Sequence, residues 1–480
     1  MDIKAVLHAL GALLVCIGAS LLIPIFVSVY YDEGDLYAFV ISLVIILIAG
    51  LAMWRFTPRD RELGIREGFG VVTFGWILMA AFGALPFIFA TEQLTYTDAF
   101  FETMSGFTTT GATILDDVES LTHALLFWRS FTHWLGGMGI IVLSLAILPM
   151  LGVGGMQLFK AEAPGPSVDK LKPRIQDTAK ILWGVYVLLT IVEAVLLKLG
   201  GMTIFDALCH TFGTLATGGF STKNAGIMHY NNAYIQYVIT IFMILAGTNF
   251  ALHYRALRGR VDVYHKNAEF RFYIGTIIFV TAFVAFSTRL SNYDSYADAF
   301  MKGIFQVVSL MTTTGYHSAD YELWPVSVQL ILVLVMFIGG CAGSTGGGIK
   351  VVRISLTTKY LFTRLKQFVH PHAVIPIRYN DVTISRDAIQ DILGFVLAFL
   401  FIFGVGSFML TLLGLDMVSA ASTAVSTLAN IGPGVGTIGP TENYAHIPAV
   451  GKWLLSFLML VGRLEVFTVL VIFNRHFWIK

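Results

Sequence analysis

The segment Phe107-Thr108-Thr109-Thr110-Gly111-Ala112 decides the fold of this chain, because three related segments follow it. They are Leu215-Ala216-Thr217-Gly218-Gly219, Met311-Thr312-Thr313-Thr314-Gly315-Tyr316 and Leu428-Ala429-Asn430-Ile431-Gly432-Pro433. Each lies between two long apolar stretches, and the aligned glycines are 107, 97 and 117 residues apart. These glycines are Gly111, Gly218, Gly315 and Gly432. The regular spacing indicates a fourfold internal repeat, and we interpret the four turns as one ion-coordinating ring.

The composition is that of a membrane protein. Of the 480 residues, 56% are hydrophobic and 13% are charged, and the mean hydropathy is +0.75. A soluble domain usually carries roughly 25% charged residues, so we predict a polytopic membrane protein. The three cysteines, Cys16, Cys209 and Cys341, have unrelated spacings that support neither a disulfide framework nor a CxxC metal site. A net charge of +1 gives no reason to expect a nucleic-acid partner.

Hydropathy predicts ten spans of about 20 residues, the length that crosses the hydrocarbon core of a bilayer. Their approximate ranges are 5–30, 37–56, 68–90, 122–150, 178–199, 232–254, 270–289, 325–350, 388–414 and 451–474. Lysine and arginine concentrate in the loops at one end of these spans, and the four turns lie among acidic loops at the other end. By the positive-inside rule, the basic loops and both termini face the cytoplasm.

A short apolar stretch precedes each turn. These stretches are 99–107, 207–215, 299–311 and 418–428. They are too short to span a bilayer, but a helix of about 15 Å reaches its middle, so we predict re-entrant pore helices. Three begin just after Asp98, Asp206 or Asp298, and the fourth begins two residues after Asp416, as suits a helix N-terminus. Their C-terminal ends, which carry partial negative charge, would point at a common centre where a cation could sit.

The expected fold is therefore an all-α polytopic membrane protein. Four pseudo-fourfold-related M1-P-M2 units, each a span, a pore helix and a second span, surround a central pore, with two extra N-terminal transmembrane helices outside them. The predicted divisions are 1–66 for the two extra helices, 67–176 for the first unit, 177–266 for the second, 267–385 for the third with a cytoplasmic linker, and 386–480 for the fourth.

The turns have the chemistry of a cation site. A dehydrated cation needs several oxygens at once, glycine lets successive carbonyls face one axis, and threonine hydroxyls can add oxygens or brace the loop. Small residues also mediate contacts between membrane helices, but four copies in the same topological place favour the ion site. The predicted filter residues are Thr109, Thr110, Gly111, Ala216, Thr217, Gly218, Thr313, Thr314, Gly315, Asn430, Ile431 and Gly432.

A second feature is the run of six glycines in ten residues at 339–348, inside the eighth predicted span. Each glycine costs a helix roughly 1 kcal/mol, so we predict a flexible loop beneath the turns that can obstruct the pore. Tight glycine packing between helices is the alternative. Arg463 lies near the centre of the last span, where burial is costly, and we predict that it bonds to this loop. The predicted gate residues are Gly339, Gly340, Gly343, Ser344, Thr345, Gly346, Gly347, Gly348 and Arg463.

Together these motifs resemble the Trk/Ktr/HKT superfamily of potassium transporters. The residues that carry the resemblance are TTTGAT, ATGGFS, MTTTGYHS and ANIGPGVG in the four units and GGCAGSTGGGIK in the third. The two extra N-terminal spans make the chain most similar to the bacterial TrkH branch. The resemblance implies potassium uptake across the bacterial inner (cytoplasmic) membrane, with K⁺ at the filter residues. It also implies a homodimer with separate pores and a cytoplasmic ring of TrkA-type RCK subunits. This chain carries no nucleotide-binding sequence, so ATP/ADP or NAD/NADH would act only through the TrkA-type partner.

Several functional alternatives follow from the same residues. Each turn has one aligned glycine in place of a full TVGYG, which predicts passage of K⁺ and Rb⁺ with weaker exclusion of Na⁺. The spans hold no chain of carboxylates, so we favour a gated passive pore over a K⁺ symporter coupled to H⁺ or Na⁺. No enzyme is expected, because the sequence has no HExxH motif. The segment 364–386 is either a docking surface for the regulatory ring or an ordinary linker.

Overall fold

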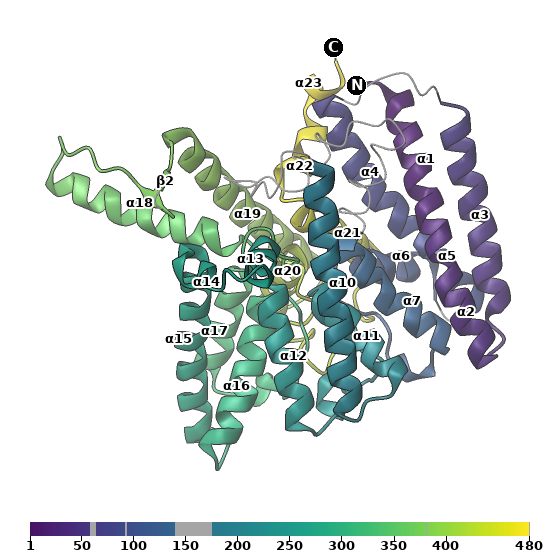
Figure 1. Ribbon diagram of the computed structural model, residues 1–480, viewed down its shortest axis with the longest axis horizontal. Coiled ribbons are helices and arrows are strands. Elements are labelled where there is room, and N and C mark those ends of the chain that lie inside the picture. The colour runs from purple at the N-terminus through teal and green to yellow at the C-terminus, as the bar shows by residue number, and fades with distance from the viewer. Residues whose placement is uncertain (58–63, 92–93, 140–174, 381, 480) are drawn as a thin grey trace.

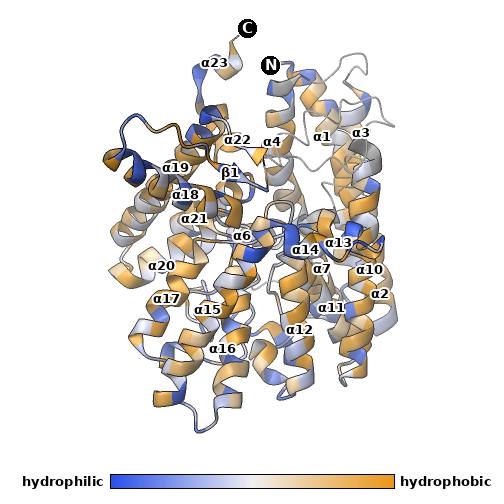
Figure 2. Cartoon of the chain, turned by 60° about the vertical axis from the view of Figure 1, so that its left-hand side comes forward, coloured by the Kyte–Doolittle hydropathy of each residue, from blue (hydrophilic) through white to orange (hydrophobic). Residues whose placement is uncertain are grey.

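The computed structural model of the chain describes residues 1–57, 64–91, 94–139, 175–380 and 382–479. These ranges form a bundle of helices, with both termini at one end (Figure 1). The described strands are β1 (Arg378–Tyr379) and β2 (Val382–Thr383), an antiparallel pair that joins Arg378 to Thr383 and Tyr379 to Val382. Hydrophobic residues cover the long helices, whereas many connecting loops are hydrophilic (Figure 2).

The prediction of a multi-pass membrane protein is confirmed by the long apolar helices. Within the described ranges, six helical segments are long and apolar enough to cross a membrane, and two bent helix pairs raise this number to eight. The six segments are α1 (Ile3–Ser20) with α2 (Leu22–Tyr31), α3 (Leu36–Arg55), α4 (Ile65–Gly83) with α5 (Leu85–Ala90), α10 (Ile175–Leu199), α15 (Ala268–Ser291) and α19 (Arg386–Leu412).

Two predicted spans are not straight helices. In the range 232–254, α12 (Ala233–Ala246) and α13 (Phe250–Leu257) meet at 102°, because the side chain of Asn249 accepts a hydrogen bond from the Ala251 N–H and starts a new helix. In the range 451–474, α21 (Ala449–Arg463) and the segment formed by α22 (Phe467–Leu470) and η5 (Val471–Phe473) meet at 112°. Glu465 and Val466 have φ angles of 55° and 57° at this break. Arg463 is the last residue of α21 and lies at this break, near the middle of the bent pair.

Two other predicted spans are only partly helical. The span 325–350 contains α17 (Val326–Met336), after which the glycine-rich segment breaks the helix as predicted, and α18 (Val351–Val369) follows. The span 122–150 begins with α7 (His123–Trp134) and the π-helical turn η2 (Leu135–Gly139), and its remainder lies outside the described residues. The short helices that complete the described chain are η1 (Val118–Ser120), η3 (Gly226–His229), α14 (Val263–Lys266), η4 (Tyr321–Leu323) and α23 (Arg475–Trp478).

Four short helices end at the four turns, each at the predicted C-terminal residue. They are α6 (Tyr96–Phe107), α11 (Ile204–Leu215), α16 (Tyr296–Met311) and α20 (Met417–Leu428). All four begin earlier than predicted, α20 by one residue and the other three by three residues, because Thr95, Thr203 and Ser295 cap those three and place the predicted aspartates inside the first turn. Asp416 is itself the cap of α20 and accepts from two backbone N–H groups. Each acid still lies near the positive end of a helix dipole.

Packing places these short helices inside the bundle. Each packs on the long helix before it: α6 on α4, α11 on α10, α16 on α15 and α20 on α19. Their last residues, Phe107, Leu215, Met311 and Leu428, are all completely buried in one continuous hydrophobic core. The turns that follow are therefore held at the centre of the protein.

Candidate functional site

The four turns share one backbone conformation. A residue with left-handed φ comes first, and a glycine with positive φ follows two residues later. The first residues are Thr109, Thr217, Thr313 and Asn430, with φ of 53°, 53°, 62° and 59°. The glycines are Gly111, Gly219, Gly315 and Gly432, with φ of 79°, 80°, 80° and 96°. Such angles are costly for residues with a Cβ, so their recurrence in four places indicates a constrained structure.

Backbone hydrogen bonds repeat in the same way. In the first turn, the N–H groups of Thr108, Thr109 and Thr110 donate to the carbonyls of Met104, Gly106 and Ser105, at 2.9, 3.0 and 2.8 Å. The other three turns form the same three bonds, to carbonyls four, three and five residues earlier. The three residues after each short helix thus donate their N–H groups to carbonyls at the end of that helix.

The shared conformation corrects the alignment of the second turn by one residue. Gly219, which the sequence prediction did not include, is the counterpart of Gly111, and Gly218 is the counterpart of Thr110. Ala216 consequently corresponds to Thr108, which is not among the predicted filter residues. The ring of His133 occupies the space that a side chain at residue 218 would need, which explains a glycine there. Because Gly218 and Gly219 are adjacent, the sequence alone does not show which of them aligns with Gly111.

Neighbouring turns touch one another in chain order. A Cβ on Gly111 would overlap the carbonyl oxygen of Gly218, and one on Gly219 would overlap that of Thr314. A Cβ on Gly315 would overlap the carbonyl oxygen of Ile431. The fourth turn then meets the first, since a Cβ on Gly432 would lie 2.7 Å from the carbonyl oxygen of Thr110. The turns thus close a ring, and all four glycines line one cavity of about 170 Å³.

The threonine hydroxyls brace this ring. Thr108 and Thr110 share a hydrogen bond of 2.8 Å, and Thr312 and Thr314 share one of 2.7 Å. The fourth turn has Asn430 where the first and third have Thr109 and Thr313, and Asn430 donates to the hydroxyl of Thr110 at 3.0 Å. Asn430 therefore links the fourth turn to the first.

Each short helix also holds the chain that follows its turn. Glu102 of α6 accepts from the Thr113 hydroxyl at 3.0 Å and the Ile114 N–H at 3.1 Å. The equivalent position in α11 is His210, whose Nε2 lies 3.0 Å from the Ser221 hydroxyl. In α16 it is Gln306, which donates to the Ala319 carbonyl at 2.9 Å. In α20, Ser422 accepts from the Val435 N–H at 2.7 Å instead. These bonds fix each turn to its own helix.

A buried ion pair joins the first two turns. The Arg129 Nε lies 2.6 Å from Glu102, and an Arg129 NH group donates to the Ser221 carbonyl at 2.9 Å. The guanidinium also lies 3.6 Å from the centre of the Phe220 ring. Neither side chain is exposed by more than 3%. Glu102 and Arg129 are 27 residues apart in the sequence, so sequence reasoning did not predict the pair.

Replacing Glu102 by glutamine is expected to destabilise the protein by about 3–5 kcal/mol, because removing one partner leaves a buried charge without compensation. Thermal unfolding in detergent measures this effect. The exposed ion pair of Asp262 and Lys266 supplies the matched control, and Asp262→Asn is expected to change stability by less than about 1 kcal/mol. Equal effects of the two substitutions would contradict a bracing role for the buried pair.

The glycine-rich segment 339–348 lies against the helix side of the turns. The Gly347 N–H donates to the Thr313 hydroxyl at 2.7 Å, and the Thr345 hydroxyl donates to the Leu215 carbonyl at 2.9 Å. A Cβ on Gly346 would lie 2.8 Å from the carbonyl oxygen of Thr312, and one on Gly347 would overlap that of Ala429. The segment thus contacts the ends of three short helices, and its small residues permit this approach.

Two cations hold the same segment. The predicted bond of Arg463 is present, since one NH group donates to the Thr345 carbonyl at 2.8 Å. The other donates to the carbonyls of Gly136 and Gly137 at 2.6 and 3.1 Å. The second cation is Lys350, which is buried and donates to the Gly346 carbonyl.

The groups at the outer ends of the short helices set the local charge. Burial alone would raise the pKa of Asp98, but the hydrogen bonds from Lys452, at 2.6 Å, and Thr95 outweigh it, and the pKa lies below its ordinary value. Burial lowers the pKa of His317, in the cavity wall, to about 4, so this ring is neutral at pH 7. The cavity wall also holds the carboxylates Asp116 and Glu442. In the described ranges, no three His, Cys, Asp or Glu side chains are grouped as a metal site would need.

Three comparisons with known proteins agree on one family. Residues 37–478 match the TrkH model, described as a cation transport protein. The chain is 43% identical to the Trk system potassium uptake protein TrkH of Salmonella typhimurium and 40% identical to that of Vibrio parahaemolyticus, in each case over the full length of both chains. The structure superposes on the crystal structure of the potassium transporter TrkH from Vibrio parahaemolyticus with a TM-score of 0.90, 37% identity and full coverage of both chains. These relatives are named as transporters, not as enzymes. The resemblance to the Trk/Ktr/HKT superfamily is confirmed, and the chain belongs to the TrkH family of cation transport proteins.

Proposed function

We propose that this protein takes up potassium across the bacterial inner membrane by conducting K⁺ through a gated, channel-like pore. The observation that carries the proposal is the closed ring of four turns with one backbone conformation around a single cavity. The names of the relatives support K⁺ as the transported ion. The basic loops put both termini in the cytoplasm.

In this proposal the chain consists of four M1-P-M2 units and two extra N-terminal spans. The units are α4–α6–α7, α10–α11–α12, α15–α16–α17 and α19–α20–α21, and the extra spans are α1 with α2, and α3. Support comes from the equivalent turns, which follow the second helix of every unit and touch in chain order. Four copies related by rotation leave an axis on which an ion can pass.

The ion filter consists of the carbonyl oxygens of the turns. The residues that line it are Thr109, Thr110, Gly111, Thr217, Gly218, Gly219, Thr313, Thr314, Gly315, Asn430, Ile431 and Gly432. Several hydroxyl groups of the ring already bond to one another, so the main chain supplies the oxygens that replace water. With only a few carbonyl layers, the filter passes K⁺ and Rb⁺ and excludes Na⁺ less completely than a five-residue filter.

The segment 339–348 is the gate, and Arg463 and Lys350 hold it closed. Support comes from its contacts with the ends of α11, α16 and α20 and from the hydrogen bonds that both cations donate to it. Opening requires these bonds to break. A homodimer and a TrkA-type cytoplasmic ring that binds ATP/ADP or NAD/NADH complete the proposed assembly, in line with relatives named as parts of a Trk system.

Ion flux into liposomes that contain only the purified chain tests this function. We expect uptake of K⁺ and Rb⁺ driven by an imposed inside-negative potential, with slower uptake of Na⁺. The driving energy is about 2.3 kcal/mol per charge for each 100 mV. Uptake of Na⁺ at the rate of K⁺, or no uptake of either ion, would contradict the proposal.

The second candidate is a K⁺ symporter coupled to H⁺ or Na⁺. One observation favours coupling to protons: Glu193 is completely buried in α10 and forms no ion pair with any described residue. Burial of an unpaired carboxylate is costly, which favours a protonated group. The reversal potential decides between the two functions. For a passive pore it depends on the K⁺ gradient alone, whereas for a symporter it also shifts when a pH or Na⁺ gradient is imposed.

A further inference from the structure

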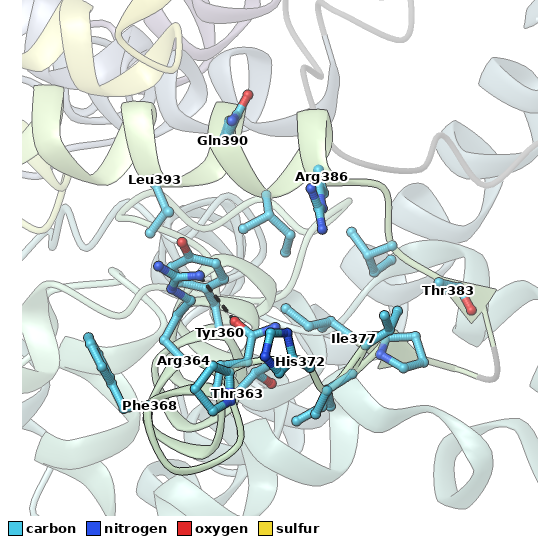
Figure 3. Close-up of a pocket in the computed structure, with 18 residues that line it drawn as sticks. Tyr360, Thr363, Arg364, Phe368, His372, Ile377, Thr383, Arg386, Gln390 and Leu393 are labelled. Atoms are coloured by element: carbon cyan, nitrogen blue, oxygen red, sulfur yellow. Dashed lines mark hydrogen bonds between the residues drawn. The ribbon is translucent and has the colours of Figure 1, made fainter.

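A cavity of about 760 Å³ lies between α18, the linker after it and the start of α19 (Figure 3). This volume is in the usual range for small-molecule sites. Tyr360, Arg364 and Phe368 line it from α18, His372 from the linker, and Arg386 and Leu393 from α19. The lining lies between the third and fourth turns in the chain and includes no turn residue.

Cationic side chains converge on this cavity. Arg364 and Arg386 come from two different helices, and neither forms an ion pair with a carboxylate among the described residues. Arg364 donates to the amide oxygen of Gln367 at 3.1 Å. From residue 350 to residue 386 the sequence has seven lysines and arginines and a single acidic residue, Asp381, which lies outside the described residues. The cavity therefore favours an anion, and guanidinium groups suit phosphate in particular.

The rest of the wall is apolar and continues onto an exposed helix face. Val374 is 92% exposed and Phe368 is 79% exposed, and both line the cavity. Beside them, α18 exposes Leu361, Phe362 and Leu365, each by more than half. A soluble phosphate would contact the arginines alone, whereas a molecule with an anionic head and a hydrocarbon tail would cover both surfaces.

The position of α18 suits a lipid of the cytoplasmic leaflet. The helix leaves the bundle sideways near the end that holds both termini (Figure 1). Under the membrane orientation proposed above, this is the cytoplasmic surface, where anionic lipids attract basic segments. A symmetric contact of this cavity with its own copy would place Arg364 and Arg386 against the same cations, so like charges disfavour that pairing.

We propose that the cavity binds the phosphate of an anionic phospholipid headgroup through Arg364 and Arg386, with the acyl chains along the apolar face of α18. The inference rests on the proposed orientation in the membrane. Because α18 begins at Val351, directly after the gate segment, a bound lipid would fix the helix that leads out of the gate.

Lipid binding to the purified full-length chain tests the proposal without any measurement of ion flux. The probes are phosphatidylglycerol, phosphatidylcholine and soluble glycerol phosphate, and native mass spectrometry reads the bound lipid. The double variant Arg364→Gln/Arg386→Gln is expected to lose roughly tenfold to thirtyfold in affinity for phosphatidylglycerol, because both direct guanidinium contacts to the phosphate are removed. The control Lys366→Gln/Arg378→Gln removes the same charge from the same segment, outside the cavity lining. Because exposed charges that do not contact the phosphate are screened by salt, it is expected to change affinity by less than about threefold.

Several results would overturn the lipid site. These are equal binding of phosphatidylcholine, glycerol phosphate binding as tightly as the lipid, and equal losses in the test and control variants. A change in oligomeric mass with unchanged lipid affinity would assign the surface to a second copy instead. Thermal unfolding of both variants verifies folding, since all four side chains are exposed. If the lipid-binding test fails, the proposal of potassium conduction is not affected, because ion flux is measured in a separate experiment.

Discussion

Replacing Gly315 by alanine is expected to lower K⁺ flux through the purified protein by at least about tenfold. Gly315 has a φ of 80°, which disfavours a residue with a Cβ by roughly 1–2 kcal/mol. The added Cβ would also overlap the carbonyl oxygen of Ile431 in the next turn, so that turn must move. If the turns form the ion filter proposed above, displacing one of its carbonyls raises the barrier to passage, and about 1.4 kcal/mol corresponds to tenfold.

Liposome flux of K⁺ and Na⁺ measures the effect of Gly315→Ala. We also expect the preference for K⁺ over Na⁺ to fall, because the ring can no longer hold one set of distances. Gly404→Ala is the matched control: Gly404 lies in α19, and an added Cβ there has no neighbour within 4 Å. Unchanged flux and selectivity in Gly315→Ala would contradict the proposal that this turn lines the ion path.

Replacing Arg463 by alanine is expected to raise K⁺ flux in the absence of any partner, by roughly fivefold or more. The guanidinium donates hydrogen bonds to the Thr345 carbonyl of segment 339–348 and to the carbonyls of Gly136 and Gly137. Bonds from a charged donor contribute about 1.5–3 kcal/mol each, so their loss favours an open segment. Removal of a positive charge beneath the ring also lowers the electrostatic barrier to a cation.

The control for Arg463→Ala is Arg258→Ala, which removes an exposed arginine at the end of α13. Flux is normalised to the amount of folded protein, because the loss of buried hydrogen bonds also lowers stability. Lys350→Met is expected to act in the same direction, since Lys350 donates to the Gly346 carbonyl of the same segment. Lower or equal flux in both variants would contradict a closing role for the two cations.

The sequence predicted features that depend on local chemistry. The ends of the four short helices at Phe107, Leu215, Met311 and Leu428 followed from the glycine and threonine turns after them. The break in the eighth span followed from the glycine run, and the bond of Arg463 to Thr345 followed from the cost of burying a charge. In each case a strong local preference coincided with the final structure.

Features set by tertiary contacts were missed. The ring of His133 decides the register of the second turn, and nothing near Gly218 and Gly219 in the sequence reveals it. The pairing of Glu102 with Arg129 depends on how α6 and α7 meet. The bends after α12 and α21 lie at short polar breaks, Thr248-Asn249 and Arg463 to Glu465, but the stretches around them are apolar enough on average that a hydropathy scan joins the two helices.

The most direct test of the central idea, a single ion path enclosed by the four turns, is to locate a heavy permeant ion by anomalous scattering in crystals grown with Rb⁺ or Tl⁺. The account predicts density on the axis between Gly111, Gly219, Gly315 and Gly432, at similar distances from all four turns, and its loss in Gly315→Ala. Density beside one turn alone, or at a site away from the ring, would contradict it.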